Sequence, residues 1–400
     1  MDERPDSAAG NATQEGLPPV LRFEDVIIGP AFNKNQPGAL WPDYASQTYA
    51  RLYRRGRAIC KAPKYAEPVA EAVDEPVIFA SCYHNHFGHL IAETVPRLPQ
   101  ALAKCGDLPI VFTRMRNDRS AVPSAMFRSV MEWLRIPLDQ IVYVDKPTKF
   151  REVYVAAQGE HLDGPQTPSE YLELLEARIA PNFEHQKPEG VAFVTRAGLD
   201  HKMGSHAGER YLVSLLRDLG VRIIDPEALS LPDQMRQYSQ ARHLAFSEGS
   251  ALHGRQLLGR IDQEIAVLRR RSDSKMAHGQ IAPRCQSLHY IDSVGGSLNI
   301  RNRYGADVAF AMKSFFNLEE IFSYFDSVGV PLRNRWSRNE YRKFRDQDVL
   351  AWIFAMYDPA IEHHLRPAND DDYLLSQFDG VYLKHLKDRA AALIKARRVK

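Results

Sequence analysis

The stretch His243-Leu244-Ala245-Phe246-Ser247-Glu248-Gly249-Ser250-Ala251-Leu252-His253 predicts a buried strand, a turn of small residues and the start of a helix. A helix that begins directly after a strand leaves the N–H groups of its first turn without intrahelical partners. Those groups and the helix dipole can hold an anion such as a diphosphate. The stretch therefore predicts a strand–turn–helix unit of an α/β fold, with a candidate anion site at its turn.

The same alternation runs through the second half of the chain. Short apolar runs bounded by Gly, Pro or Asp predict strands, and amphipathic segments between them predict helices. The predicted strands are 191–194, 221–224, 243–246 and 265–268, and the predicted helices are 209–220, 231–242 and 251–259.

The first half has a similar pattern. Its predicted strands are 77–80, 110–112, 141–144 and 152–156, and its predicted helices are 125–135 and 169–179. Short buried strands that alternate with helices indicate parallel sheets covered by helices. We therefore expect two Rossmann-like α/β domains, with a ligand site in a cleft between them.

Composition changes mark the expected domain boundaries. Residues 1–18 are rich in Asp, Glu, Ser, Ala, Gly and Pro, which predicts a disordered tail. We expect an N-terminal α/β domain over 19–185, a second α/β domain over 186–322 and a helical C-terminal extension over 323–400.

The overall charge excludes one class of partner. The 400 residues carry 52 Lys and Arg against 50 Asp and Glu, a net charge of +2, so nonspecific nucleic-acid binding is not expected. Four cysteines without a CxxC pair indicate neither a disulfide framework nor a zinc ribbon.

The chain shows no secretory signal and no apolar run long enough for a membrane span. We expect a cytoplasmic protein. The basic end, 384–400, leaves peripheral attachment to the inner membrane open, but a solvated helix face is the preferred explanation.

A second stretch carries groups for proton transfer: His86-Phe87-Gly88-His89-Leu90-Ile91-Ala92-Glu93-Thr94-Val95-Pro96-Arg97-Leu98. In a helix that starts near Gly88, His89, Glu93 and Arg97 share one face at i, i+4 spacings. A neighbouring carboxylate raises the basicity of an imidazole and orients it, so His89 is a candidate general base. Pro96 has no N–H to donate to the carbonyl of Ala92, which predicts a kink.

Two other interpretations of this stretch remain open. Glu93 and Arg97 could form an ordinary helical ion pair beside a structural histidine. Alternatively, His84, His86 and His89 could bind a metal ion, as in a metal-dependent hydrolase, with Glu93 as base or ligand.

The candidate anion site gains further residues from the chain around it. Small side chains at Gly249, Ser250 and Ala251 would let a diphosphate approach the backbone, and His253 and Arg255 could add positive charge. Arg196 follows the strand 191–194, at the sheet edge where α/β proteins bind ligands, and could clamp a phosphate. The glycine-containing loop 197–208, with Lys202, could close over the ligand.

Taken in this order, these pieces resemble glycosyltransferase family 61, with the resemblance running from about residue 77 to 268. The family's pattern of Asn, an aromatic pair, His, apolar residues, an acid and Leu-Pro-Arg-Leu resembles 85–98. Its strand that ends in Ser/Thr-Arg resembles Val194-Thr195-Arg196. Its Asp-Pro-Glu-x-Leu-Ser pattern resembles the sequence from Asp225 to Ser230.

The sequence departs from the family at the turn that usually reads His-Gly-Ala-Gly-Leu-Thr-Asn. Glu248 replaces the histidine, and His253 and Gly254 replace Thr-Asn. A carboxylate beside a diphosphate is unfavourable unless it faces a hydroxyl. We therefore assign Glu248 to a ribose or donor-sugar hydroxyl.

The resemblance implies a GT-B fold, with 19–185 as the acceptor-side domain and 186–322 as the nucleotide-sugar domain. It also implies an inverting transfer of a sugar from a nucleotide-diphosphate donor, with no metal and no cofactor. It implies His89 or Glu93 as the base, and Arg196 with the amides of Gly249, Ser250 and Ala251 as the diphosphate site. The implied partners are a nucleotide sugar, a glycan or lipid-linked polysaccharide acceptor and other polysaccharide-assembly enzymes, as in bacterial capsule and surface-polysaccharide biosynthesis. The replacement at Glu248 also leaves open a catalytically silent scaffold of the same fold.

Overall fold

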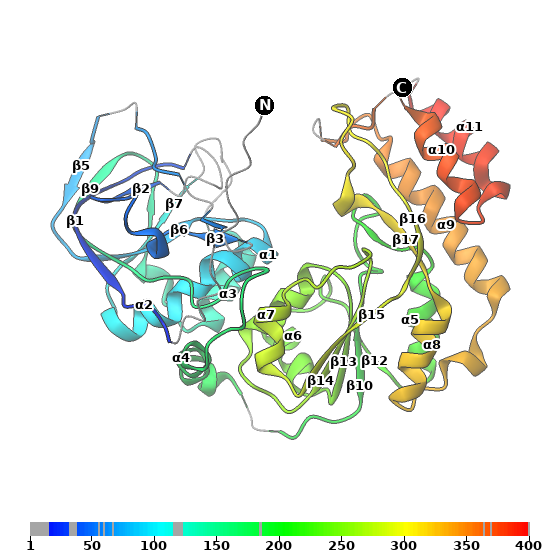
Figure 1. Ribbon diagram of the computed structural model, residues 1–400, viewed down its shortest axis with the longest axis horizontal. Helices are drawn as coiled ribbons and strands as arrows, with labels where there is room; N and C mark the ends of the chain where they lie inside the picture. Colours follow the sequence, from blue (N-terminus) through cyan, green and yellow to red (C-terminus); the bar gives the residue numbers. More distant parts are fainter. Residues whose placement is uncertain are drawn as a thin grey trace. The chain divides into compact units, whose positions relative to one another are not determined.

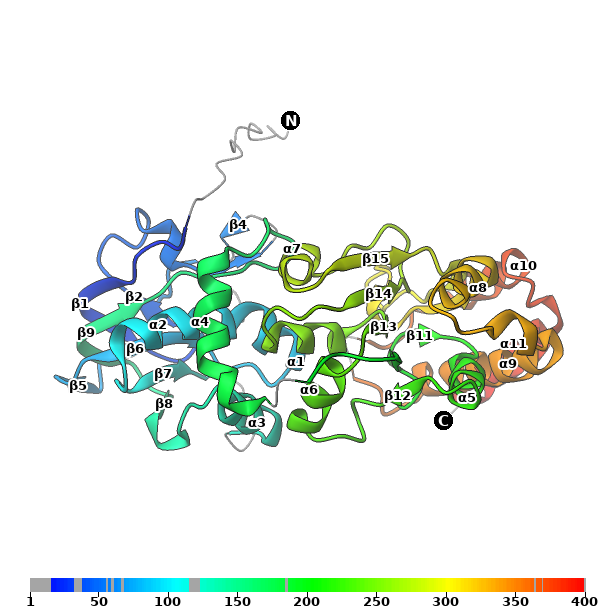
Figure 2. The same cartoon turned by 90° about the horizontal axis from the view of Figure 1, so that it is seen from below.

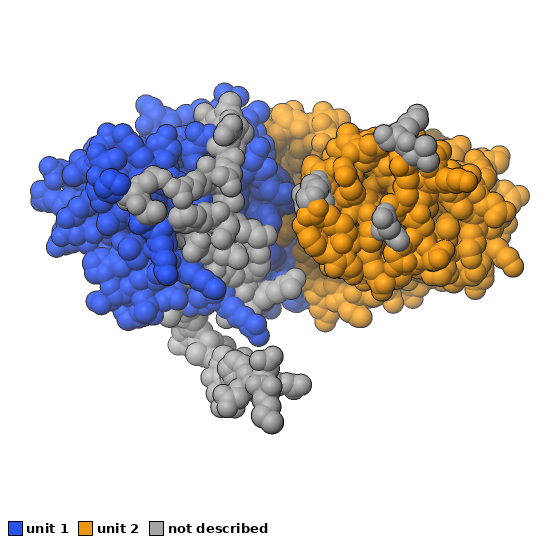
Figure 3. Space-filling model, turned by 90° about the horizontal axis from the view of Figure 1, so that it is seen from above, with its two compact units in different colours: residues 1–182, 277–283 blue, residues 183–276, 284–400 orange. Residues whose placement is uncertain are grey.

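The computed structural model of the protein describes residues 16–398, except 32–37, 55–56, 59–60, 66–67, 115–122, 184–185, 363–364 and 369. It divides into two compact units (Figure 3): unit 1 comprises residues 1–182 and 277–283, and unit 2 comprises 183–276 and 284–400. The predicted tail lies outside the described residues up to residue 15, and so does residue 185 at the predicted domain boundary. The segment 323–400, expected as a separate extension, belongs to unit 2.

The fold is mixed α/β, as expected. Unit 1 has a sheet with seven strands among the described residues. Its order is β2 (Ala39–Leu40), β1 (Leu21–Ile28), β9 (Thr148–Val155), β6 (Val77–Cys82), β7 (Ile110–Thr113) and β8 (Ile141–Val144), with β5 (Glu71–Val73) also beside β9. The strands β5, β9, β6, β7 and β8 pair in parallel, whereas β1 and β2 pair antiparallel. A small hairpin joins β3 (Tyr53–Arg54) to β4 (Arg57–Ala58).

The helices of unit 1 carry its apolar residues inward. The α-helices are α1 (Phe87–His89), α2 (Leu98–Cys105), α3 (Ala125–Trp133), α4 (Ser169–Ile179) and α7 (His278–Ile281), and the short 3₁₀ turns are Thr48–Ala50, Leu138–Gln140 and Ala180–Asn182 (Figure 1). The hydroxyl of Ser124 accepts a hydrogen bond from the N–H of Phe127 and so caps the start of α3. Strand β8 connects to β9 through residues 145–147 alone, so the regular strand–helix alternation stops there.

The sheet of unit 2 has five parallel strands within 186–362. In spatial order they are β12 (Arg222–Ile224), β10 (Val191–Val194), β13 (His243–Ser247), β14 (Glu264–Leu268) and β15 (Ser287–Ile291). Counted along the chain, this order is second, first, third, fourth, fifth. Starting from β10, the chain first adds β12 on one side and then crosses over to add β13 on the other, so the strand order reverses between β10 and β13. Open α/β sheets bind ligands at the carboxyl ends of the strands at such a switch point.

The rest of unit 2 consists of helices and a second, smaller sheet. Its α-helices are α5 (Glu209–Asp218), α6 (Leu231–Ser239), α8 (Leu318–Ser327), α9 (Arg338–Met356), α10 (Asp371–Gly380) and α11 (Lys387–Arg398). Its 3₁₀ helices are Ser250–Leu257, Ala309–Ala311, Leu332–Arg335 and Lys384–Leu386, and a further 3₁₀ turn, Ala282–Arg284, crosses the boundary with unit 1. A second small sheet has the order β11 (Ser205–His206), β17 (Lys313–Phe316) and β16 (Val294–Leu298).

The predicted α-helix over 251–259 is instead the 3₁₀ helix Ser250–Leu257. The N–H of Leu252 donates to the carbonyl of Gly249, three residues back, and the N–H of Leu258 donates to Arg255 in the same way. A 3₁₀ helix is wound more tightly than an α-helix. The helix still begins directly after the turn at Gly249, so its first amides remain available as the sequence predicted.

The C-terminal helices share a core with the rest of unit 2. Helices α9, α10 and α11 lie side by side (Figures 1 and 2), and their buried faces form one cluster with residues of β16, β17 and 300–311. Trp352 on α9 is fully buried in this cluster, and its indole N–H donates to the carbonyl of Ala311 at 2.9 Å. The segment 323–400 therefore stabilises unit 2. Among the described residues, no helix combines the length and the hydropathy that crossing a bilayer requires.

Trp352→Ala should lower the free energy of unfolding of unit 2 by about 3–5 kcal/mol, because it opens a cavity and leaves the Ala311 carbonyl without its donor. Phe354 lies on the same helix with 48% of its surface exposed, so Phe354→Ala should cost about 1 kcal/mol or less and is the matched control. Urea denaturation followed by circular dichroism measures both. Equal midpoints for the two variants would contradict a shared core.

Candidate functional site

The first candidate constellation, in unit 1, contains the predicted histidine–carboxylate pair. Nδ1 of His89 lies 3.0 Å from Oε1 of Glu93, at the predicted i, i+4 spacing. Glu93 is 1% exposed, whereas the side chain of His89 is 31% exposed. A hydrogen bond from Nδ1–H to Glu93 puts the basic lone pair of the imidazole on Nε2. A buried carboxylate thus orients a partly exposed imidazole, which is the arrangement a general base requires.

The backbone around this pair is not a continuous α-helix. The helix α1 ends at His89, a π-helical turn spans Leu90–Thr94, and a 3₁₀ turn spans Val95–Arg97 before α2 begins. Pro96 is the reason, because it has no N–H for an α-helical bond to Ala92. The N–H of Val95 instead donates to Leu90, five residues back, and the carbonyl of Pro96 accepts from Gly159 at 2.9 Å. Where a kink was predicted, the structure has a π turn, a feature that often occurs at functional sites.

Arg97 is not part of an exposed polar stripe. It is 2% exposed, and its Nη2 donates to the carbonyl of Ala50. Leu90, Ile91 and Leu98 around it are fully buried. Arg97 therefore holds the segment around Ala50 against the helix.

The alternative metal site finds no support in the structure. The ring of His89 lies 5.7 Å from that of His84 and 4.9 Å from that of His86, measured between centroids. Across the described parts of the chain, however, no group of three or more His, Cys, Asp or Glu side chains is placed to hold a metal ion. The imidazole ring of His89 instead packs against those of His84 and His86.

The second candidate constellation lies at the switch point of unit 2, where Glu209 joins two strand ends. Oε1 of Glu209 accepts from Oγ1 of Thr195 and from the N–H of Arg196, both at 2.7 Å. Its Oε2 accepts from Oγ of Ser247 at 3.0 Å. Thr195 and Arg196 follow β10, and Ser247 ends β13. One buried carboxylate therefore holds the ends of the two strands together.

Arg196 and the Gly249 turn lie in direct contact. A Cβ atom placed on Gly249 would lie 1.8 Å from Nη1 of Arg196, so only glycine leaves room for the guanidinium. Nε and Nη2 of Arg196 donate to the carbonyl of Gly204, at 3.1 and 2.8 Å. The amides of Ser250 and Ala251 have no acceptor from the described residues. The structure thus brings together Arg196, Gly249, Ser250 and Ala251, as the sequence predicted.

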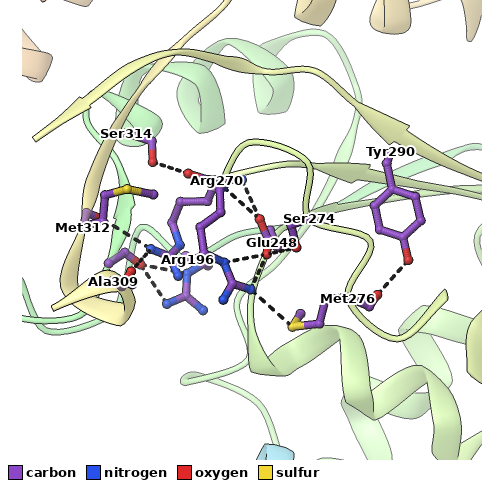
Figure 4. Close-up of polar contacts among 11 residues, drawn as sticks. Arg196, Glu248, Arg270, Ser274, Met276, Tyr290, Ala309, Met312 and Ser314 are labelled. Atoms are coloured by element: carbon purple, nitrogen blue, oxygen red, sulfur yellow. Dashed lines mark hydrogen bonds and ion pairs between the residues drawn. The ribbon is translucent and has the colours of Figure 1, made fainter. Parts of the chain in front are cut away.

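Glu248 is fully buried, and residues after β14 donate hydrogen bonds to both oxygens of its carboxylate. Oε2 accepts from the backbone N–H groups of Arg270, at 2.7 Å, and Arg271, at 3.1 Å. Oε1 accepts from the guanidinium of Arg271 and from Oγ of Ser274, at 2.7 Å (Figure 4). Burial acts to raise the pKa of Glu248, but the attraction of Arg271 and the hydrogen bond from Ser274 outweigh it and lower the pKa. Glu248 therefore fixes the loop after β14, and its predicted contact with a ribose or sugar stays a prediction.

The other predicted residues occupy different environments. His253 is 5% exposed within the 3₁₀ helix. Lys202 is on the surface, with Nζ 3.8 Å from Asp200 and 4.0 Å from Glu362. Arg255 is fully buried and donates to Gln263, Gly259 and Arg284, so it holds the chain after the helix and does not add charge to the turn.

Three cationic residues beside Arg196 were not predicted from the sequence. Arg270 and Arg271 follow β14, and Lys313 begins β17. Arg270 and Lys313 are 4% and 2% exposed. The run Arg269-Arg270-Arg271 comes directly after a predicted strand, so the strand-end rule that selected Arg196 would also have selected it. Nothing local marks Lys313, which reaches the cluster through β17 of the second sheet.

Comparison with known proteins agrees with the resemblance in the sequence. The family model described as Glycosyltransferase 61 matches residues 87–255. The match begins just before His89 and ends after the Gly249 turn, so it includes both constellations. No curated protein matches the chain significantly. Over residues 87–255 the chain is therefore similar to the glycosyltransferase 61 family.

Proposed function

We propose that the protein is an inverting, metal-independent glycosyltransferase of the GT-B type. It transfers a sugar from a nucleotide diphosphate to a hydroxyl of a glycan or lipid-linked polysaccharide. The observation that carries this proposal is the contact of Arg196 with the Gly249 turn at the switch point between β10 and β13, within the part of the chain that the family match covers.

The donor side of the reaction rests on charge. As the bond from sugar to phosphate breaks, negative charge develops on the departing diphosphate, and fixed cations and N–H groups lower the energy of that state. Arg196 and the amides of Ser250 and Ala251 supply such groups, and Glu209 fixes the backbone that carries Arg196. These residues bind the diphosphate and stabilise it as the leaving group.

The acceptor side rests on proton transfer. The acceptor hydroxyl must lose its proton as it attacks the anomeric carbon, and His89 takes this proton as general base. Glu93, buried behind it, orients the imidazole and stabilises the imidazolium that forms. We assign the base to His89 and the positioning role to Glu93.

The biological setting follows from the family. Because bacterial members of this family often act in surface-polysaccharide biosynthesis, we propose a role there, in the cytoplasm, alongside other assembly enzymes. We also propose that the basic C-terminal helix α11 makes peripheral contact with an anionic membrane that holds a lipid-linked acceptor, although Lys387, Arg397 and Arg398 on this helix already form ion pairs with carboxylates of unit 2.

Arg196→Ala should lower turnover of a nucleotide sugar by about 100-fold or more, the usual effect of removing one group that stabilises developing negative charge. Arg236 on α6, whose side chain is 62% exposed, provides the control: Arg236→Ala should leave turnover unchanged. Release of nucleoside diphosphate from a panel of nucleotide sugars measures the rate, with chelator present.

Turnover that disappears when chelator is added would contradict metal independence. A wild-type protein that neither consumes nor is stabilised by any nucleotide or nucleotide sugar would instead favour a silent scaffold.

His89→Ala should lower kcat by about 100-fold or more with little change in the KM for the donor, because it removes the base but not the diphosphate site. Glu93→Gln keeps a hydrogen-bonding group of the same size beside Nδ1 and should lower kcat less. The measurement is kcat and KM for each variant with donor and acceptor varied separately. A larger loss of kcat in Glu93→Gln than in His89→Ala would exchange the two assigned roles.

A further inference from the structure

Three buried cations lie close together at the carboxyl end of the unit 2 sheet. Arg196 follows β10, Arg270 follows β14, and Lys313 begins β17, so three elements contribute one charge each. Their exposed fractions are 8%, 4% and 2%. Electrostatic repulsion acts between all three pairs. Such a cluster is costly to bury unless negative charge compensates it.

The contacts of the three cations are dipoles and not carboxylates. Arg196 donates to the carbonyl of Gly204, and Nζ of Lys313 donates to Oγ of Ser205 at 2.5 Å. Nη1 of Arg270 lies 3.4 Å from the carbonyls of Ala309 and Met312 (Figure 4), distances that make weak hydrogen bonds, and its Nε has no partner among the described residues.

The carboxylates nearby do not neutralise the cluster. Glu248 forms its ion pair with Arg271, and Asp348 forms one with Arg210. Glu209 accepts from Thr195, Ser247 and the backbone of Arg196. In the described parts of the chain, no carboxylate oxygen lies within 4.0 Å of the charged nitrogens of Arg196, Arg270 or Lys313. Glu248 and Asp348 also attract members of the cluster, but each is already paired with a further arginine. With these pairs set aside, Glu209 is left against three cations, an excess of about two positive charges.

This excess changes the ionisation of the cluster. Burial, with repulsion from Arg196, lowers the pKa of Arg270 to about 10. Burial lowers the pKa of Lys313 to about 8, with Arg196 and Arg270 adding to this effect and Asp348 and Glu209 opposing it. Burial, and then the charge of Lys313, lower the pKa of His201 from its ordinary value. Between about pH 7 and 9, Lys313 is thus the member of this group that titrates.

We propose that Arg270 and Lys313 bind the diphosphate of the donor together with Arg196, and that Lys313 takes up a proton when the diphosphate binds. The inference rests on the proposed function and extends its site to two elements outside the family match. Phosphate oxygens would replace the carbonyl contacts of Arg196 and Arg270 with charge-assisted hydrogen bonds, which are about twice as strong. A bound anion favours the charged ammonium, so it raises the pKa of Lys313.

The affinity for the diphosphate should depend on pH through Lys313. Below about pH 8 the free protein already carries the charged Lys313, and binding needs no proton. Above about pH 8 the free protein has lost this proton, and binding must recover it from the buffer. The contribution of Lys313 to affinity therefore falls as pH rises through about 8.

The test uses inorganic pyrophosphate, the part that all diphosphate donors share, and isothermal titration calorimetry on the full-length protein. At pH 7.0, Lys313→Met and Arg270→Gln should each weaken binding by about tenfold or more, the loss expected for one charge-assisted hydrogen bond. Lys343 on α9, with 66% of its side chain exposed, gives the matched control, and Lys343→Met should bind as the wild type does.

Proton uptake provides the second measurement. Titrations at about pH 8.5 in two buffers of different ionisation enthalpy give the number of protons taken up on binding. Wild type should take up more protons than Lys313→Met, and this difference cancels the ionisation of pyrophosphate itself. Lys313→Arg keeps the charge but does not titrate in this range, so it should bind tightly without the extra uptake.

The outcomes separate the two proposals. Folded Lys313→Met and Arg270→Gln proteins that bind pyrophosphate as tightly as wild type, with equal proton uptake, would overturn this inference and show the cations to be structural. If Lys313→Met fails to fold, wild type and Lys313→Arg still decide, because equal proton uptake by these two overturns it. Binding that depends on these residues without turnover of any nucleotide sugar would support the anion site and reject the transferase.

Discussion

The carboxylate of Glu209 is the constraint on which the rest of unit 2 depends. It lies at the start of α5 and accepts hydrogen bonds from Thr195, from the backbone of Arg196 and from Ser247. A buried carboxylate is stable only when its oxygens are satisfied, and here the groups that satisfy it come from two strands at the switch point. Its position therefore fixes where the chain after β10 and the chain before Gly249 meet.

Local patterns in the sequence predicted much of this fold. The helix Ser169–Ile179 and the strands at 141–144 and 191–194 have the predicted bounds, because apolar periodicity and flanking Pro and Gly residues are local signals. The same signals located His89, Glu93, Arg196 and the Gly249 turn. They missed the 3₁₀ winding after Gly249 and the π turn before Pro96, since the tertiary setting decides which carbonyl an N–H reaches.

The remaining differences arise from pairings between residues distant in sequence. Arg255 was expected near the anion site, but Gln263 and the carbonyls of Gly259 and Arg284 draw its guanidinium into the core. Lys313 could not be predicted because it does not follow a predicted strand, and only the pairing of β17 with β11 brings it to Ser205. A charged residue in a sequence indicates that a buried side chain needs a partner, but only the tertiary structure determines which partner it has.

One segment ties the order of synthesis to the order of folding. Residues 277–283 belong to unit 1 although the chain on both sides belongs to unit 2, and the carbonyl of Gly279 accepts from the N–H of Thr167. At about 5–20 residues per second, the ribosome makes this segment roughly 5–20 seconds after residue 182. Unit 1 is therefore incomplete while the first four strands of the parallel sheet of unit 2 are translated. A fragment that stops at residue 182 lacks residues 277–283 of unit 1.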